Sequence, residues 1–304
     1  MNYRRLILSG IAFTSLPFTI MAEDIKSQVY TGNMLHYQAE TKLMLDNNNR
    51  PITGVAQNFY ASGKLSDEAM FTNGKQNDLA RSYYENGQIK KERTYVNGVL
   101  EGPYKDYDEQ GNLLTEGTFR NAQLEGVIKD YYPQEKLKRE ATYQNNVLNG
   151  PYKEYYDNGR LKIEAIFVNG KQDKTLKSYY NNGQLYKERH YKNGILEGKL
   201  TEYSEQGIIQ LEALFVNGKL EGLVKEYDEN GKIEAVTPYK DGKAEGVAKE
   251  YYPTGLIKSE TPYKDGEIDG FYKEYDEQGN VKDEAKFREG KKRILPKSLL
   301  KLHL

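Results

Sequence analysis

The chain has 304 residues, of which 44 are basic and 45 are acidic, so its formal net charge is −1. It contains no cysteine and only three histidines, which excludes disulfides and thiolate chemistry and disfavours a histidine metal site. The balanced charge lacks the basic field that nucleic-acid binding requires. We therefore expect no cofactor, no metal ion and no nucleic-acid partner.

The first 22 residues have the pattern of a secretory signal peptide. Arg4 and Arg5 precede an apolar stretch from Leu6 to Met21, and Ala22 offers a small residue for cleavage. The alternatives are an uncleaved membrane anchor or a buried strand, but the stretch is short for a membrane span. Cleavage after Ala22 removes two arginines and no acids, so the charge becomes −1 − 2 = −3. We expect an exported protein that is periplasmic, bound to the cell surface or secreted.

Beyond this segment, the chain divides into three parts. Residues 23–53 are irregular and resemble a degenerate first unit or cap. Residues 54–290 repeat with a period of 24, about ten times. A period of this length indicates a repeat array and not a globule with one deep pocket. Residues 291–304 are basic and leucine-rich, and we expect a cap or a disordered end, with a membrane-contacting helix as the alternative.

Two sets of glycines mark two turns in each repeat. One set is broken only at Glu135, and its members are the expected structural turns Gly63, Gly87, Gly111, Gly159, Gly183, Gly207, Gly231, Gly255 and Gly279. The other set consists of Asn-Gly or Asp-Gly pairs ending at Gly74, Gly98, Gly170, Gly194, Gly218, Gly242 and Gly266. Such pairs are strong hairpin signals, because both positions tolerate positive φ.

A two-residue loop at Asn158-Gly159 predicts the strand pairing on either side of it. The predicted pairs are Tyr156–Leu161, Glu154–Ile163, Lys153–Glu164 and Tyr152–Ala165. Alternation along each strand then predicts an apolar face with Tyr152, Tyr156, Leu161, Ile163, Ala165 and Phe167, and an opposite face with Lys153, Tyr155, Lys162 and Glu164. The same rule at Asn217-Gly218 predicts the apolar-face pairs Phe215–Leu220, Ala213–Gly222 and Leu211–Val224. We therefore expect an all-β, elongated antiparallel meander of β-hairpins.

The signature GxYKEYYxNGxLKxExxYxNGxxxG resembles the variant MORN repeat of bacterial proteins over roughly residues 54–290. The resemblance implies β-hairpin arrays that mediate protein or membrane contact, and such proteins often carry an antitoxin label. Asp78 and Lys174 replace the third glycine, and Val236 replaces the mid-strand glutamate, with Glu234 nearby. The irregular residues Ala122, Glu135 and Asn146 cluster between residues 120 and 150, which suggests a local bend.

A tyrosine recurs once per repeat on the face opposite the apolar one. Its flat ring and polar tip suit a sugar, a peptide strand or a protein partner, whereas the alternative is a purely structural role in the strands. The candidate partner-binding residues are Tyr83, Tyr107, Tyr131, Tyr155, Tyr179, Tyr203, Tyr227, Tyr251 and Tyr275.

Charged residues recur in two rows beside these tyrosines. The basic row is Arg81, Lys105, Lys129, Lys153, Lys177, Lys225, Lys249 and Lys273, and the acidic row is Glu92, Glu116, Glu140, Glu164, Glu188, Glu212, Glu260 and Glu284. Predicted cross-strand neighbours such as Lys153 and Glu164 favour mutual neutralisation. A carboxylate pair for catalysis is the alternative, but a uniform repeat offers no place with a distinct environment.

Acidic turns such as Asp228-Glu229-Asn230-Gly231 and Asp276-Glu277-Gln278-Gly279 raise the possibility of calcium binding. They lack the spacing of known calcium loops, so we expect ordinary hairpin turns.

These observations favour an exported, non-enzymatic scaffold that binds a macromolecular partner, in the first place a protein, through a long tyrosine-rich surface. Cell-wall glycan binding and neutralisation of a protein toxin are the alternatives. Membrane contact is expected only through the basic tail, because the mature chain is otherwise acidic.

Overall fold

The computed structural model describes residues 28–293, and its regular structure is β-strand apart from two 3₁₀ turns, η1 (Gly32–Met34) and η2 (Pro133–Glu135). A short hairpin consists of β2 (Leu35–Gln38) and β3 (Leu43–Asp46). All other strands belong to one 25-stranded sheet. They are β1 (Val29–Thr31), β4 (Gly54–Phe59), β5 (Leu65–Thr72), β6 (Lys75–Tyr83), β7 (Ile89–Val96), β8 (Val99–Tyr107), β9 (Leu113–Arg120), β10 (Gln123–Tyr132), β11 (Lys136–Gln144), β12 (Val147–Tyr155), β13 (Leu161–Val168), β14 (Lys171–Tyr179), β15 (Leu185–Lys192), β16 (Ile195–Tyr203), β17 (Ile209–Val216), β18 (Lys219–Leu220), β19 (Gly222–Tyr227), β20 (Ile233–Lys240), β21 (Lys243–Ala244), β22 (Gly246–Tyr251), β23 (Ile257–Lys264), β24 (Glu267–Ile268), β25 (Gly270–Tyr275), β26 (Val281–Arg288) and β27 (Lys291–Arg293).

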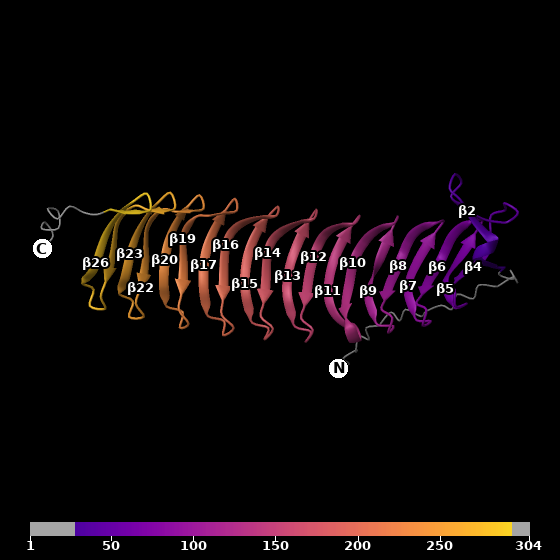
Figure 1. Ribbon diagram of the computed structural model, residues 1–304, viewed down its shortest axis with the longest axis horizontal. Helices are drawn as coiled ribbons and strands as arrows, with labels where there is room; N and C mark the ends of the chain where they lie inside the picture. The colour runs from indigo at the N-terminus through magenta and orange to yellow at the C-terminus, as the bar shows by residue number, and fades with distance from the viewer. Residues whose placement is uncertain (1–27, 294–304) are drawn as a thin grey trace, which may run out of the picture.

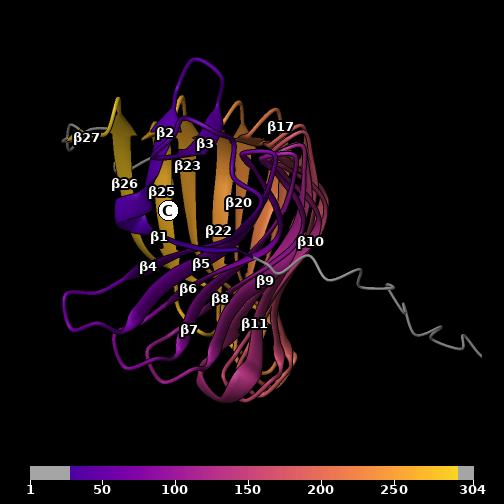
Figure 2. The same cartoon turned by 90° about the vertical axis from the view of Figure 1, so that its right-hand side faces the viewer.

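The sheet is a single elongated layer in which the strands from β4 to β27 pair antiparallel in chain order (Figure 1). The long strands β17, β20 and β23 each pair with a short strand and with the strand that follows it. Figure 2 shows that the strands rotate progressively along the array, as the right-handed twist of strands requires. The predicted all-β, elongated hairpin array is confirmed. No helix within residues 28–293 is long and apolar enough to cross a membrane.

The Asn-Gly pairs form the two-residue turns expected of them. Val168 lies opposite Lys171, and the turn residues Asn169 and Gly170 have φ values of 50° and 76°. Positive φ at both positions is the type I′ geometry, whose twist matches that of the flanking strands. The irregular region between residues 120 and 150 keeps the register of the other repeats, so the register gives no sign of the suggested bend. Ala122 and Asn146 adopt positive φ there without glycine.

The other turn is longer than predicted. Tyr155 and not Tyr156 lies opposite Leu161, because Tyr156 closes the loop by donating its backbone N–H to the carbonyl of Arg160. Gly159 donates back to the Tyr156 carbonyl, and all nine glycines of this set have φ between 77° and 92°. A bulge beside Tyr155 restores the register, so the other three predicted pairs around this turn are confirmed. Beside this bulge Lys162 reaches Glu154, at 2.8 Å.

A second bulge lies at the position of the third glycine, which is Asp78 or Lys174 in two repeats. Phe215 lies opposite Leu220 as predicted, but further along the hairpin Leu211 lies opposite Glu226 and not Val224. The predicted Ala213–Gly222 pair is not among the pairs that β17 forms with β18 and β19. Since a slip of two residues leaves every side chain on its own face, the predicted faces survive this error.

The apolar face supplies the core, although the sheet has only one layer. Small side chains such as Ala213, which is 5 % exposed, lie beneath Leu200 and Val224 of the adjacent strands. Elsewhere aromatic rings cover this face, as where the centroids of Tyr104 and Phe119 are 4.8 Å apart. Each repeat is therefore buried by its neighbours, as in other repeat arrays.

The two ends of the sheet differ. At the first edge, β1 pairs in parallel with β4, and Ile52 is buried with Tyr30 and Phe71. Residues of the expected N-terminal unit therefore cover this edge. At the other edge, β27 extends the sheet into the basic tail with three exposed residues. The predicted signal peptide and residues 294–304 lie outside the described residues.

A candidate interaction surface on one face of the sheet

The face opposite the apolar one carries a continuous row of charges that crosses the sheet. Each member is the direct cross-strand partner of the next, and acid alternates with base along almost the whole row. We call this row the charge ladder. Its members are Glu68, Arg81, Glu92, Lys105, Glu116, Lys129, Glu140, Lys153, Glu164, Lys177, Glu188, Thr201, Glu212, Lys225, Val236, Lys249, Glu260, Lys273 and Glu284.

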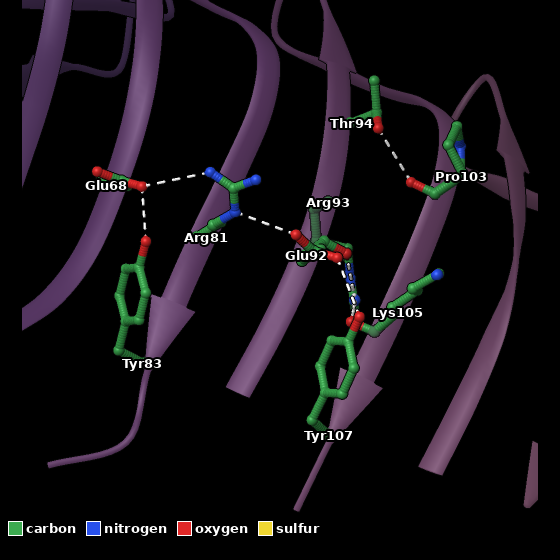
Figure 3. A network of polar contacts seen from close by, with 9 residues as sticks. All are labelled: Glu68, Arg81, Tyr83, Glu92, Arg93, Thr94, Pro103, Lys105 and Tyr107. Atoms are coloured by element: carbon green, nitrogen blue, oxygen red, sulfur yellow. Dashed lines mark hydrogen bonds and ion pairs between the residues drawn. The ribbon is translucent and has the colours of Figure 1, made fainter. Parts of the chain in front are cut away.

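Neighbouring charges of the ladder form ion pairs at several points. Arg81 lies between two acids, with its guanidinium 3.0 Å from Glu92 and 3.6 Å from Glu68 (Figure 3). Lys249 is 3.2 Å from Glu260. These side chains are partly exposed, so each pair contributes only about 0.2–1 kcal/mol. The arrangement agrees with the predicted mutual neutralisation, and Lys153 and Glu164 are cross-strand partners as expected.

The candidate tyrosines lie beside the ladder and donate hydrogen bonds to it. Tyr83 donates to Glu68 at 2.6 Å, and Tyr107 donates to Glu92 at 3.1 Å (Figure 3). Each acceptor lies 15 residues earlier in the chain, and the same bond joins Tyr131–Glu116, Tyr155–Glu140, Tyr179–Glu164, Tyr227–Glu212 and Tyr275–Glu260. All nine candidate tyrosines are half-buried. Their hydroxyl groups therefore serve the sheet itself in seven repeats.

These contacts change the acidity of both partners. Burial, followed by the hydrogen bond to Glu68, raises the pKa of Tyr83 to about 12. Burial and the bond to Glu92 raise the pKa of Tyr107 to about 12 in the same way. The bond from Tyr275 is the largest of the effects that lower the pKa of Glu260. At neutral pH Tyr83 and Tyr107 are therefore neutral donors, and Glu260 is an ionised acceptor.

A second row of tyrosines joins the repeats at the longer turns, and sequence reasoning missed its role. Tyr84 donates its hydroxyl to the backbone carbonyl of Tyr107 at 2.8 Å, and Tyr156 donates to that of Tyr179 at 2.7 Å. Four further tyrosines bond in the same way, with donors at Tyr60, Tyr132, Tyr180 and Tyr252. The adjacent Tyr-Tyr pair in the repeat was the available signal. Successive residues of a strand point to different faces, so the second tyrosine cannot make the same contact as the first.

An exposed apolar stripe, the aliphatic band, lies on the same face as the ladder. It comprises apolar residues two positions before a basic residue of the ladder or two or four positions after a glutamate of the ladder, together with apolar cross-strand partners of these positions. Its members are between 39 % and 52 % exposed. They are the aliphatic residues Leu79, Val96, Val99, Val127, Val147, Val168, Ile195, Leu214, Val216, Leu223 and Val247, together with the aromatic residue Phe271. Sequence reasoning described this face by its charges and tyrosines alone. The valines beside the Asn-Gly turns, four residues after the glutamates, were the missed signal.

The hollows on this face are open and shallow. One, of about 350 Å³, lies between the ladder residues Lys153 and Glu164 and the residues Pro151 and Ile166. Within residues 28–293 no cluster of acidic residues and histidines is arranged to hold a metal ion. At the acidic turn, Asp228 accepts the backbone N–H groups of Asn230 and Lys232, which lowers its pKa. That carboxylate therefore closes the turn, as turn chemistry predicts.

Comparison with known families identifies the repeat. The model described as "MORN repeat variant" matches residues 52–73, 79–97, 100–121, 124–145, 148–169, 172–193, 220–241 and 244–265. These segments together span more than half of the chain. The matches omit the repeat that contains Thr201, one of the two uncharged members of the ladder. No curated protein matches this sequence.

The comparison with solved structures gives matches of low score. One is titled "Crystal Structure of TcdB2-TccC3-Cdc42", with 12 % identity, 84 % coverage of this chain and a TM-score of 0.20. Another is titled "Structure of Photorhabdus luminescens Tc holotoxin pore, Mutation TccC3-D651A", with 10 % identity, 81 % coverage and a TM-score of 0.15. This chain spans 16 % and 13 % of the length of those chains, respectively, and such low scores transfer no function. The family model and the repeated hairpin geometry together show that the chain belongs to the family of variant MORN repeat proteins.

Proposed function

We propose that this protein is an exported, non-enzymatic scaffold that binds a protein partner through the face that holds the charge ladder and the aliphatic band. The aliphatic band carries the proposal. Exposed apolar side chains that gather on one face and are bordered by polar residues are typical of interaction sites. Because the band repeats along a long sheet, contacts that are weak in one repeat add up over several repeats.

The form of the face supports a scaffold more than an enzyme. Its charges are arranged uniformly, and its hollows are open, whereas catalysis needs one enclosed place with a distinct environment. The tyrosine geometry also favours a protein over a glycan. Rings that stack on sugars must be accessible, but the candidate tyrosines are half-buried and most of their hydroxyl groups are engaged by glutamates.

Cross-linking mass spectrometry on the native cells tests this function. We expect one recurrent protein partner, with cross-links that map to residues near the aliphatic band. The double variant Val168→Asn and Leu223→Asn lies within the band and should abolish these cross-links. The double variant Leu256→Asn and Val281→Asn also changes exposed apolar residues, at 45 % and 54 % exposure, but lies outside the band and should retain them. Recovery with wall or lipid fractions alone contradicts a protein partner.

Export has its own test. The N-terminal sequence of the protein isolated from the envelope or the medium is expected to begin at Glu23, because the proposed cleavage follows Ala22. An intact N-terminus in the cytoplasmic fraction contradicts export. That result does not bear on the binding face, so export and binding are tested separately.

A further inference from the structure

The charge ladder is interrupted at Val236, where every regular repeat has a glutamate. Lys225 on β19 and Lys249 on β22 are the two cross-strand partners of this valine. Tyr251 stands 15 residues after it, in the position from which other repeats donate a hydroxyl to the glutamate. Val236 thus replaces a carboxylate, while the three groups that surround such a carboxylate elsewhere are all retained.

The intact repeats show what these three groups hold. Glu260 has Lys249 at 3.2 Å, receives the Tyr275 hydroxyl at 2.9 Å and has Lys273 as its other cross-strand partner. Glu164 receives the Tyr179 hydroxyl at 2.6 Å between Lys153 and Lys177. A base on either side and a phenol donor therefore form the regular carboxylate environment of this sheet.

The interruption at Val236 leaves an excess of positive charge. At the other irregular ladder position, Thr201 lies between two acids, and Lys199 from the same strand compensates with an ion pair of 2.5 Å to Glu212. Glu212 is the ladder neighbour of Lys225, but it is already engaged by Lys199 and by the Tyr227 hydroxyl. Among the described residues, Lys225 and Lys249 are therefore the two successive lysines of the ladder that have no acidic residue between them.

Glu234 does not fill the gap. It occupies the position that Lys162 has in its own repeat, next to the bulge, from which that side chain reaches Glu154 and the ring of Tyr156. Within residues 28–293 Glu234 forms no ion pair with Lys225 or Lys249. Val236 is shorter than glutamate and carries no charge, so the ladder has no carboxylate between Lys225 and Lys249.

We propose that this position binds a carboxylate from an aspartate or glutamate side chain of a protein partner. The incoming group takes the place of the missing glutamate, between Lys225 and Lys249 and within reach of the Tyr251 hydroxyl. This inference rests on the proposed function, since it names the chemistry of the partner at one point of the binding face. A carboxylate is the choice because the same three groups hold carboxylates throughout the sheet.

A fluorescein-labelled octaglutamate peptide serves as the probe, and its binding to the exported chain is followed by fluorescence anisotropy at low ionic strength. Val236→Glu fills the position from within, so we expect it to weaken peptide binding about tenfold. Val281→Glu adds the same charge at an exposed residue outside the ladder and the band, and it should leave the affinity unchanged. Lys225→Met should weaken binding without adding an acid.

Two results overturn the proposal. Equal weakening by Val236→Glu and Val281→Glu would show that only net charge matters, and absence of binding to the unmodified chain would show that there is no site. A phosphoserine peptide of equal length and vesicles of phosphatidylserine are tested in parallel. Binding of either that depends on Val236, without binding of octaglutamate, assigns the position to phosphate groups and contradicts a carboxylate. None of these results bears on the cross-links at Val168 and Leu223, so failure here is distinguishable from failure of the scaffold.

Discussion

The hydroxyl of Tyr179 donates a hydrogen bond of 2.6 Å to Glu164, which lies 15 residues earlier in the chain. The bond joins β14 to β13 on the ladder face, and its counterparts recur in six other repeats. We expect Tyr179→Phe to lower the free energy of unfolding by about 0.5–1.5 kcal/mol, because the ring stays in place while the donor is lost. Urea denaturation measures this change.

Tyr203→Phe is the matched control for this substitution. Tyr203 occupies the same position in its own repeat, but within the described residues its hydroxyl has no hydrogen bond to Glu188. The control should change the stability by less than Tyr179→Phe does. Equal effects of the two substitutions would mean that ring packing, and not the bond to glutamate, determines the contribution of these tyrosines.

Alkaline pH should unfold the array. The pKa of Tyr83 is raised from 10.0 to about 12, and that of Tyr227 is raised to about 12 as well. A raised pKa in the folded state means that the unfolded chain loses these protons first. The stabilisation is therefore complete below pH 10 and is lost as the pH rises through 12. Tyrosinate absorbance should show delayed ionisation, coincident with the loss of β-sheet circular dichroism. Ionisation near the ordinary pKa with the sheet intact contradicts this account.

The sequence predicted the hairpins, the two faces and the position of Tyr155, because each depends on period and alternation. Neither an Asn-Gly pair nor a single glycine states the length of its turn. The error at Tyr156 arose because the backbone of that residue closes a longer loop, which only the hydrogen bond to Arg160 reveals. The bulge at Gly222 was also missed, because only the strand pairing that places Leu211 opposite Glu226 reveals it. The tyrosine hydroxyls could not be assigned from sequence, since their acceptors lie in a neighbouring strand.

Replacing Lys174 by glycine should stabilise the protein. Lys174 stands at the third glycine of its repeat and has a φ of 60°, which is unfavourable for a residue with a Cβ. Relief of this strain exceeds the entropy that glycine adds to the unfolded chain, so we expect a gain of about 0.5–1 kcal/mol. Gly126→Ala makes the opposite change at a φ of 78°, with no atom within 4 Å of the added Cβ. It should destabilise the protein, and thermal unfolding compares the two. A gain from both variants would show that the bulge stores no strain.

Val236→Glu should stabilise the array as well as close the proposed carboxylate position. The new side chain lies between Lys225 and Lys249, so it gains two charged neighbours and the hydroxyl of Tyr251. We expect about 1 kcal/mol, the upper end of the range for an exposed ion pair. The gain should decrease at high salt, because the charges are screened. Val281→Glu, with one exposed acid outside the ladder, should give no such gain. A destabilised Val236→Glu chain would mean that the packing of the valine methyl groups outweighs the charges, and that the two lysines are already neutralised within the protein.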